Sequence, residues 1–189
     1  APGSRSGPAV GSRASTSRTR VFFAIWPDAR LARSLYQAAR HTQNGGSGRL
    51  MRADTLHLTL AFLGDVAGED LSRLIEIAMR IKFQPFELQL DRIGYWKHNA
   101  IVWAGTAQVP PALTALAESL ADALRAAGFR LEERSFKPHI TLVRKFSGVP
   151  VAALQPPLHW QVDRFRLVIS RPDRHGARYE LVGEWPAPP

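Results

Sequence analysis

The 189-residue chain contains no cysteine, and this absence excludes disulfide bonds and thiolate chemistry. It also lacks an apolar run of the about 18–20 residues that a membrane-spanning helix needs. Residues 1–19 contain no apolar core of the about 7–15 residues that is typical of a secretory signal. We therefore expect a cytoplasmic protein that does not enter a membrane.

Acidic residues are scarce: 16 Asp and Glu stand against 25 Lys and Arg, which gives a formal net charge of +9. Such an excess suits a polyanionic partner such as nucleic acid, although it also serves simple solubility. Large aliphatic side chains are scarce in residues 1–19, where Val10 is the only one. That segment cannot bury enough apolar surface to offset the entropy lost on ordering. We predict a flexible basic tail over residues 1–19 and a single folded domain over residues 20–189.

Hydrophobic periodicity in residues 20–189 indicates strands that alternate with helices. Asp28 is placed to cap the first helix, and Pro110-Pro111 to begin the last one, which ends before Gly128. Gly94 is expected to end the strand that begins at Phe86. The pattern predicts strands over residues 21–26, 56–63, 86–91, 100–103, 129–131, 140–143, 160–169 and 179–182. The second half of this order loosely repeats the first, which predicts an α+β fold with two pseudo-equivalent lobes.

The pattern His-x-Thr-x occurs twice, once from His57 to Leu60 and once from His139 to Leu142. Each copy lies in an apolar run that is typical of a buried strand. Residues i and i+2 of a strand point to the same face, so the histidine and the threonine of each copy project together. If the two strands lie side by side, two imidazoles and two hydroxyls meet in one cleft. Such a cleft could handle a phosphate without a metal ion.

These residues resemble the 2H phosphoesterase family, and most closely its RNA 2′,3′-cyclic phosphodiesterases, also called 2′-5′ RNA ligases. Leu-x-Phe-Leu-Gly follows the first histidine motif and Lys-Pro precedes the second, and the resemblance also takes in Arg178-Tyr179. It covers residues 20–185. The resemblance implies a bilobed α+β fold of two pseudo-symmetric lobes, each with mainly antiparallel sheet, outer helices and one motif facing a central groove.

The same resemblance implies an enzyme, an RNA 2′,3′-cyclic phosphodiesterase that opens the cyclic phosphate to a 2′-phosphate without a metal or a cofactor. In the reverse direction the reaction would join RNA ends by a 2′-5′ bond. By resemblance His57 is the acid that protonates the leaving oxygen and His139 is the base that activates water. An ordinary histidine pKa of about 6.5 lets one ring be neutral and the other protonated near neutral pH. The residues alone leave the order of these two roles open.

Four further side chains receive roles. Thr59 and Thr141 would donate hydrogen bonds to the non-bridging phosphate oxygens. By resemblance Arg144 approaches the phosphate, and its fixed charge suits that contact. If Phe23 stands at the cleft edge, it could stack on the base or ribose next to the phosphate. We expect Phe22 and Phe23 to face opposite sides of their strand, so that one of the two belongs to the core.

Three alternatives remain open at this point. A metal site is one, although each motif supplies a single good ligand and no cysteine completes a set. A non-catalytic module that binds a nucleotide or an RNA end is another. The third keeps the enzyme but changes its substrate to 2′-5′ oligonucleotides or to another cyclic phosphate. We expect a monomer whose partner is RNA or an oligonucleotide with a 2′,3′-cyclic phosphate end.

Overall fold

The structure, a computed structural model, describes residues 17–150 and 153–189. The helices are α1 (Ala29–Gln43), α2 (Leu71–Arg80), α3 (Pro111–Ala126) and the short 3₁₀ helices η1 (Ala53–Thr55) and η2 (Gly68–Asp70). The strands are β1 (Arg18–Ile25), β2 (Gly46–Leu50), β3 (Leu58–Ala67), β4 (Phe86–Trp96), β5 (Ile101–Gly105), β6 (Ile140–Gly148), β7 (Ala153–Val162), β8 (Arg164–Asp173) and β9 (Gly176–Pro186). Residues 1–16, which hold most of the expected tail, lie outside the described part.

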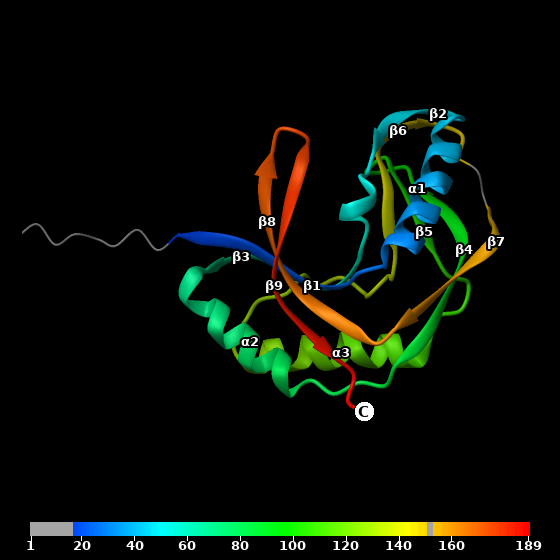
Figure 1. The fold of residues 1–189 in the computed structure, drawn as a ribbon. Coiled ribbons are helices and arrows are strands. Elements are labelled where there is room, and N and C mark those ends of the chain that lie inside the picture. The colour runs from blue at the N-terminus through cyan, green and yellow to red at the C-terminus, as the bar shows by residue number, and fades with distance from the viewer. Residues whose placement is uncertain (1–16, 151–152) are drawn as a thin grey trace, which may run out of the picture.

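The strands form one curved, antiparallel sheet in the order β7-β4-β5-β6-β3-β1-β8-β9, with β2 paired to β6. One residue pair, Leu58 with Ile140, joins β3 to β6 at the middle of this order. The sheet therefore has two halves, and each half begins at one histidine motif. Figure 1 shows the β8–β9 hairpin rising on one side of the fold and β2 with β6 on the other. The α+β fold with two lobes of mainly antiparallel strands is thus confirmed.

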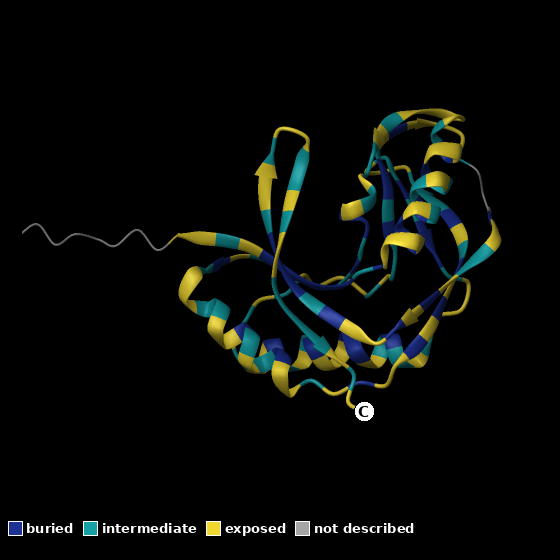
Figure 2. Ribbon diagram, viewed as in Figure 1, coloured by how far each residue is buried: buried dark blue, intermediate teal, exposed yellow. Residues whose placement is uncertain are grey.

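The helices cover the outside of this sheet. The helix α1 packs against β2, β6 and β7, whereas α3 packs against β3 and α2 contacts β9. Figure 1 shows α2 and α3 beneath the sheet, away from the hairpin. The buried stripe of α3 is the leucine series expected from its helical spacing, Leu113, Leu116, Leu120 and Leu124. In Figure 2 buried residues gather where the strands cross and where α3 meets them. The same core cluster includes Leu31, Leu35 and Ala39 of α1, so the hydrophobic core runs from α3 through the motif strands to α1.

Asp28 caps α1 as expected, because its carboxylate accepts a hydrogen bond of 2.7 Å from the backbone N–H of Leu31. This cap fixes the point at which the chain leaves β1 and turns into α1. Trp26 lies in the same short connection, two residues before the cap. The position of the indole is therefore tied to the start of the helix.

The expectation that Gly94 ends its strand is wrong. Gly94 lies inside β4 and pairs with Trp103 of β5. A Cβ atom at this position would collide with the Trp103 indole. The glycine thus makes room for a large ring on the neighbouring strand. Composition alone does not distinguish a glycine that makes room in this way from a glycine that ends a strand.

Several other elements also differ from the sequence-based predictions: β2 was not predicted, and most strands extend beyond their predicted ends. Residues 129–131 form no strand, and the single strand expected over residues 160–169 is divided at Asp163 between β7 and β8. Arg18 and Thr19, assigned to the tail, belong to β1 and pair with Ala67 and Val66. The folded part thus begins earlier than predicted, because pairing with β3 continues to the start of β1. Among the described residues, the helices are all too short or too polar to cross a membrane.

Candidate active site

The two motif strands bring their histidines and threonines to one cleft of about 530 Å³ between the two halves of the sheet. His57, Thr59, His139 and Thr141 all line this cleft. The alternate residues of both strands, Leu58, Leu60, Ile140 and Leu142, are buried in the core on the opposite face. The two-residue period of a strand therefore produces the juxtaposition that the motifs predicted.

Both histidines are held by the same local contact. The Nδ1 atom of His57 lies 2.7 Å from the backbone oxygen of Thr55, and the Nδ1 atom of His139 lies 2.7 Å from the backbone oxygen of Lys137. A carbonyl oxygen only accepts, so each Nδ1 carries the hydrogen and donates it. In the neutral ring, Nε2 is then the nitrogen with a free lone pair. Each histidine thus offers one nitrogen for proton transfer.

Aromatic rings enclose His57. Its ring stacks on Phe22 at 4.9 Å and on Trp26 at 4.8 Å, measured between centroids, and meets Tyr179 edge-on at 5.1 Å. Both faces of the imidazole are therefore covered. Desolvation by this burial is the main cause that lowers the pKa of His57 from 6.5 to about 4, while its hydrogen bond to Thr55 acts in the opposite direction. In the free protein His57 is neutral at pH 7.

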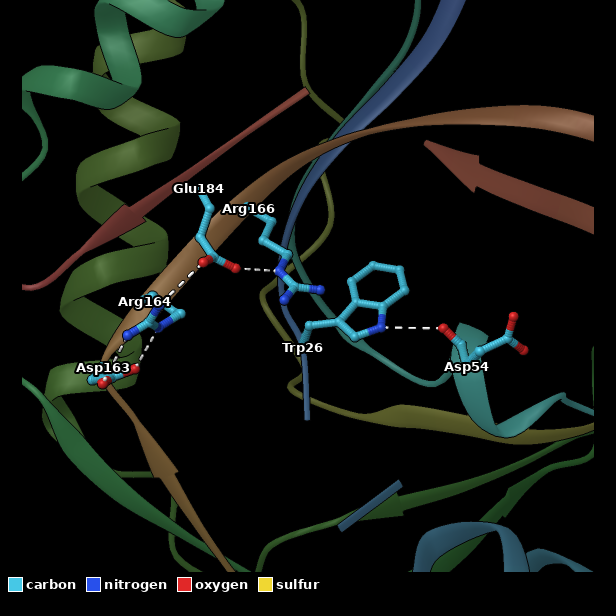
Figure 3. A network of polar contacts seen from close by, with 6 residues as sticks. All are labelled: Trp26, Asp54, Asp163, Arg164, Arg166 and Glu184. Atoms are coloured by element: carbon cyan, nitrogen blue, oxygen red, sulfur yellow. Dashed lines mark hydrogen bonds and ion pairs between the residues drawn. The ribbon is translucent and has the colours of Figure 1, made fainter. Parts of the chain in front are cut away.

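Polar and charged side chains also contact Trp26, as Figure 3 shows. The indole Nε1 donates a hydrogen bond of 3.2 Å to the backbone oxygen of Asp54 in η1. The Arg166 guanidinium lies 5.7 Å from the indole ring centre, and its Nε donates to Glu184 at 2.6 Å. These contacts restrict the indole to one orientation, and they tie η1, β8 and β9 to the ring that stacks on His57.

His139 is less enclosed than His57. The Trp96 ring meets it at 4.5 Å with an interplanar angle of 72°. Burial is the main cause that lowers the pKa of His139 below its usual 6.5, and the positive charge of Arg144 lowers it further. The two histidines thus share a hydrogen-bond pattern but differ in how far water reaches them.

Positive charge lines the rest of the cleft. Arg20, Arg49, Arg52 and Arg144 contribute to its wall, and none of the residues that line it is acidic. Arg52 pairs with Asp54 and Arg20 lies 3.8 Å from Asp65, whereas Arg144 has no ion pair with any residue in 17–150 or 153–189. Its charge adds to the lowering of the pKa of both histidines, and it opposes the burial that raises the pKa of Tyr179 above 10. The expected arginine is therefore in the cleft, close to both imidazoles.

Phe23 is not in the cleft, so the expectation that it contacts the substrate is wrong. Its side chain is fully buried and packs against Phe165 and Trp185 at centroid distances of 6.1 and 6.4 Å. The alternation of β1 instead places Phe22 in the cleft wall, against His57. The sequence showed that one of these two residues had to be core, but only the pairing of β1 with β3 and β8 decides which.

Sequence reasoning gave no role to several residues of the site. Trp26 and Phe22 stack on His57, Tyr179 covers its edge, and Trp96 lies against His139. Trp26 is separated from His57 by 31 positions, and Tyr179 comes from the other end of the chain. No local pattern indicates such contacts. Tyr179 lies in a stretch that supports the family resemblance, and this was the one signal that pointed to it.

Residues that could complete a metal site do not gather at this cleft. In the described ranges, 17–150 and 153–189, no three His, Cys, Asp or Glu side chains lie close enough together to hold an ion.

Comparison with known proteins agrees with this geometry. The family model "LigT like Phosphoesterase" matches residues 25–103 and 105–179, which include both histidine motifs. The chain is 36% identical over 168 residues to the RNA 2′,3′-cyclic phosphodiesterase of Escherichia coli strain K12, a match that covers 88% of this chain and 95% of that protein. It is 29% identical over 177 residues to the protein of the same name from Thermus thermophilus, covering 86% of this chain and 87% of the relative.

Solved structures show the same fold. Escherichia coli LigT in complex with 3′-AMP superimposes with a TM-score of 0.83 at 34% identity, covering 90% of this chain and 99% of that one. The Thermus thermophilus protein TT0787 gives a TM-score of 0.73 at 26% identity, covering 88% of this chain and 97% of that one.

Proposed function

The chain belongs to the LigT-like phosphoesterase family, and we propose that it hydrolyses the 2′,3′-cyclic phosphate ends of RNA to 2′-phosphates. The observation that carries this proposal is the pair of histidines in one cleft, each donating Nδ1–H to a backbone oxygen and each keeping Nε2 for proton transfer. If a 5′-hydroxyl of RNA took the place of water as the nucleophile, the same groups would join RNA ends by a 2′-5′ bond, with the P–O3′ bond broken and the 3′-hydroxyl released. The names of the curated relatives agree with the hydrolytic direction.

In the proposed mechanism a water molecule attacks phosphorus, and Nε2 of His139 takes one of its protons. Nε2 of His57 donates a proton to O3′ as the P–O3′ bond breaks. The product is a 2′-phosphate monoester with a free 3′-hydroxyl, so atoms and protons balance. The reaction then ends with His139 protonated and His57 neutral, and exchange with solvent restores the starting states.

The burial of His57 requires the substrate to take part in its protonation. With a pKa of about 4, His57 is neutral near pH 7 in the free protein. A cyclic phosphate carries one negative charge, and an opposite charge within hydrogen-bond distance raises a histidine pKa. His57 therefore gains its proton as the anion binds. Substrate binding is thereby coupled to protonation of the acid, His57.

Thr59 and Thr141, which line the cleft, are assigned to the non-bridging phosphate oxygens, to which their hydroxyls would donate hydrogen bonds. Arg144 offsets the charge that develops on those oxygens in the transition state. Its lack of an ion-pair partner among the described residues supports this role, because a free guanidinium is available to an anion. Proton transfer and charge compensation are then supplied by side chains, and the proposal needs no metal.

One chain supplies both motifs and every arginine of the cleft. We propose accordingly that the protein acts as a monomer, and that it works in the cytoplasm on RNA fragments that end in a cyclic phosphate.

The test is turnover of 2′,3′-cyclic nucleoside monophosphates and of an oligonucleotide that ends in a 2′,3′-cyclic phosphate. We expect a 2′-phosphate product from both, identified by chromatography against 2′- and 3′-phosphate standards. Tight binding of these compounds without any turnover would instead support the non-catalytic module. Turnover restricted to 2′-5′ oligonucleotides would change the substrate but not the site.

The variants His57→Ala and His139→Ala test the two proton-transfer roles. Each should lower kcat by about 10²–10⁴-fold, the loss typical of one acid–base group. His41→Ala is the matched control, because His41 is an exposed residue of α1 outside the cleft. Circular dichroism establishes that each variant is folded. A folded His57→Ala or His139→Ala protein with nearly normal kcat contradicts the assignment.

A further inference from the structure

A second hollow, of about 770 Å³, adjoins the cleft beyond His139. It shares Thr59, Phe62 and His139 with the cleft. Its other walls come from α3, from residues 131–137 and from the turn after β4, and we call it the α3 groove. A nucleotide whose phosphate lies between the histidines can therefore extend into two different spaces. One is the α3 groove and the other is the arginine side of the cleft, formed by Arg20, Arg49 and Arg52.

The two spaces differ sharply in charge. The arginine side contains no acidic residue. The α3 groove carries acids and bases in equal number: Glu118, Asp122 and Glu132 against Arg125, Arg134 and Lys137. Two of these bases are already paired, because Arg125 lies 3.7 Å from Asp122 and Arg134 lies 3.7 Å from Glu132. A phosphodiester group placed in the α3 groove would meet carboxylates among its lining residues, whereas the lining of the arginine side holds none, although Arg20 and Arg52 pair with Asp65 and Asp54 outside that lining.

Aromatic and apolar side chains complete the α3 groove where it meets the cleft. Trp96 lies against His139, with 4.5 Å between the ring centroids, and Phe62 borders both spaces. Phe136 and Leu131 line the groove further along. A nucleobase is neutral and flat, and stacking on such rings is the usual way in which proteins bind unpaired bases.

The terminal nucleoside of the substrate branches at its ribose. From the cyclic phosphate, one branch leads to the base and the other to the 5′-phosphate and the rest of the RNA. Building on the proposed function, we infer that the base of the terminal nucleoside lies in the α3 groove, while the phosphates of the upstream RNA lie along the arginine side. The uncharged base thus enters the α3 groove, in which acids and bases balance, and the charged phosphates enter the cationic arginine side.

Filling the α3 groove tests the position of the base. Ala121 lines the groove from α3 and belongs to neither motif strand. Ala121→Trp should lower kcat/KM for 2′,3′-cyclic AMP relative to base-free ribose 2′,3′-cyclic phosphate. The ratio of the two should fall by about five- to 150-fold, the range expected for losing the stacking of one base. Ala126→Trp is the matched control, because Ala126 is an exposed residue of α3 outside the groove.

Removal of one ring from the groove gives an independent variant that adds no bulk. Phe136→Ala should lower the same ratio in the same direction. Thermal unfolding of both variants shows whether they are folded. If folded Ala121→Trp and Phe136→Ala proteins keep the ratio of the unaltered chain, the base lies elsewhere and the inference is overturned.

The arginine side is tested with chain length. Arg20→Gln and Arg49→Gln should each lower the ratio of kcat/KM for an oligonucleotide with a cyclic phosphate end to that for 2′,3′-cyclic AMP. In the unaltered chain the oligonucleotide rate should fall with salt, with a logarithmic slope of about −0.7 per phosphate contacted, and each substitution should flatten that slope. Arg80→Gln is the control, since Arg80 is an exposed residue of α2 outside both spaces.

The outcomes separate this inference from the proposed function. If the unaltered chain hydrolyses no cyclic phosphate, the proposed function fails and this inference fails with it. If it hydrolyses cyclic nucleotides but Arg20→Gln and Arg49→Gln leave the oligonucleotide ratio and the salt slope as they were, only the inference fails. A fall of the oligonucleotide ratio in Ala121→Trp, with no change for the cyclic mononucleotide, would place the RNA in the α3 groove and overturn the inference as well.

Discussion

At the scale of single residues, the two histidines are unequal although their motifs are the same. Both rings donate Nδ1–H to the backbone oxygen two residues earlier. The difference lies in what covers them: His57 is enclosed by Phe22, Trp26 and Tyr179, whereas Trp96 meets only one side of His139. Desolvation therefore acts more strongly on His57, and its neutral form is favoured.

This inequality predicts the pH dependence of kcat/KM, which reports the ionisation of the free enzyme. The reaction needs one protonated and one neutral histidine, whichever is the acid. The pKa of both rings lies below 6.5, at about 4 for His57. Above both pKa values both rings are neutral, and below both values both are protonated, so the rate falls on either side. We expect a maximum on the acidic side of pH 6.5, measured with 2′,3′-cyclic AMP; a maximum above pH 7 contradicts this.

Trp26 should act as a positioning residue for His57. Trp26→Ala removes one stacking ring and admits water, so the pKa of His57 should rise toward its usual 6.5. The ascending limb of the kcat/KM profile should then move to higher pH by about one unit. Trp26→Phe keeps an aromatic face and should shift the limb less. If Trp26→Ala lowers kcat at every pH without moving the limb, the indole has only a packing role.

Arg144 should stabilise the transition state. Arg144→Ala is expected to lower kcat/KM by about 10²-fold, because one charged contact to the phosphate is lost. Arg144→Lys retains a positive charge and should recover part of that loss. Arg33→Ala, at an exposed position of α1, is the control. A kcat/KM equal to that of the unaltered chain would make Arg144 an ordinary surface arginine.

At the scale of elements, the rim of the cleft is closed by a contact between distant segments. The Arg49 side chain of β2 donates a hydrogen bond of 3.2 Å to the backbone oxygen of His175 at the tip of the β8–β9 hairpin. Gly176 follows in that turn with a φ of 126°, and a Cβ atom there would meet the Arg49 guanidinium. The hairpin of one half of the sheet is thus joined to the edge of the other half.

The start of α1 contributes to stability at the same scale. Asp28→Ala removes the only side-chain cap of α1 and should lower the free energy of unfolding by about 1 kcal/mol. Asp28→Ser supplies another capping oxygen and should retain most of that stability. Denaturant unfolding of the three proteins measures the difference. Equal stability of Asp28→Ala and the unaltered chain would show that tertiary packing alone fixes the helix start.

At the scale of the whole molecule, the excess of positive charge is not spread evenly. Four arginines line the cleft and no acid does, while the α3 groove is balanced. The positive charge is therefore concentrated on one side of the active site. This local charge can steer an anionic substrate toward the cleft.

The complete machinery is carried by side chains of one chain, and this predicts independence of divalent metals. Turnover of 2′,3′-cyclic AMP should stay the same after dialysis against a chelator, because imidazoles transfer the protons and Arg144 with the threonine hydroxyls compensates charge. The dialysed enzyme assayed without chelator is the control. Loss of activity in chelator that zinc or magnesium restores would contradict the proposed mechanism.

Local pattern was sufficient for the parts of this protein that depend on one stretch of chain. The alternation in each motif strand predicted that His57 and Thr59, and likewise His139 and Thr141, face the same way, and the structure has them in one cleft. The cap at Asp28 and the leucine stripe of α3 followed from helix rules in the same manner. Such features are set by backbone geometry within a few residues, and this is why the sequence determines them.

Tertiary structure alone decided everything that depends on contacts between distant segments. The order of strands joins β1 to both β3 and β8, and this pairing sends Phe23 into the core and Phe22 to His57. Likewise only the folded chain brings Trp26 and Tyr179 around the same imidazole and so lowers its pKa. Desolvation arises from all neighbours in space, whereas a motif records only neighbours along the chain. The sequence thus determined which histidines and threonines meet at the proposed site, and the tertiary structure decided how acidic and how accessible they are.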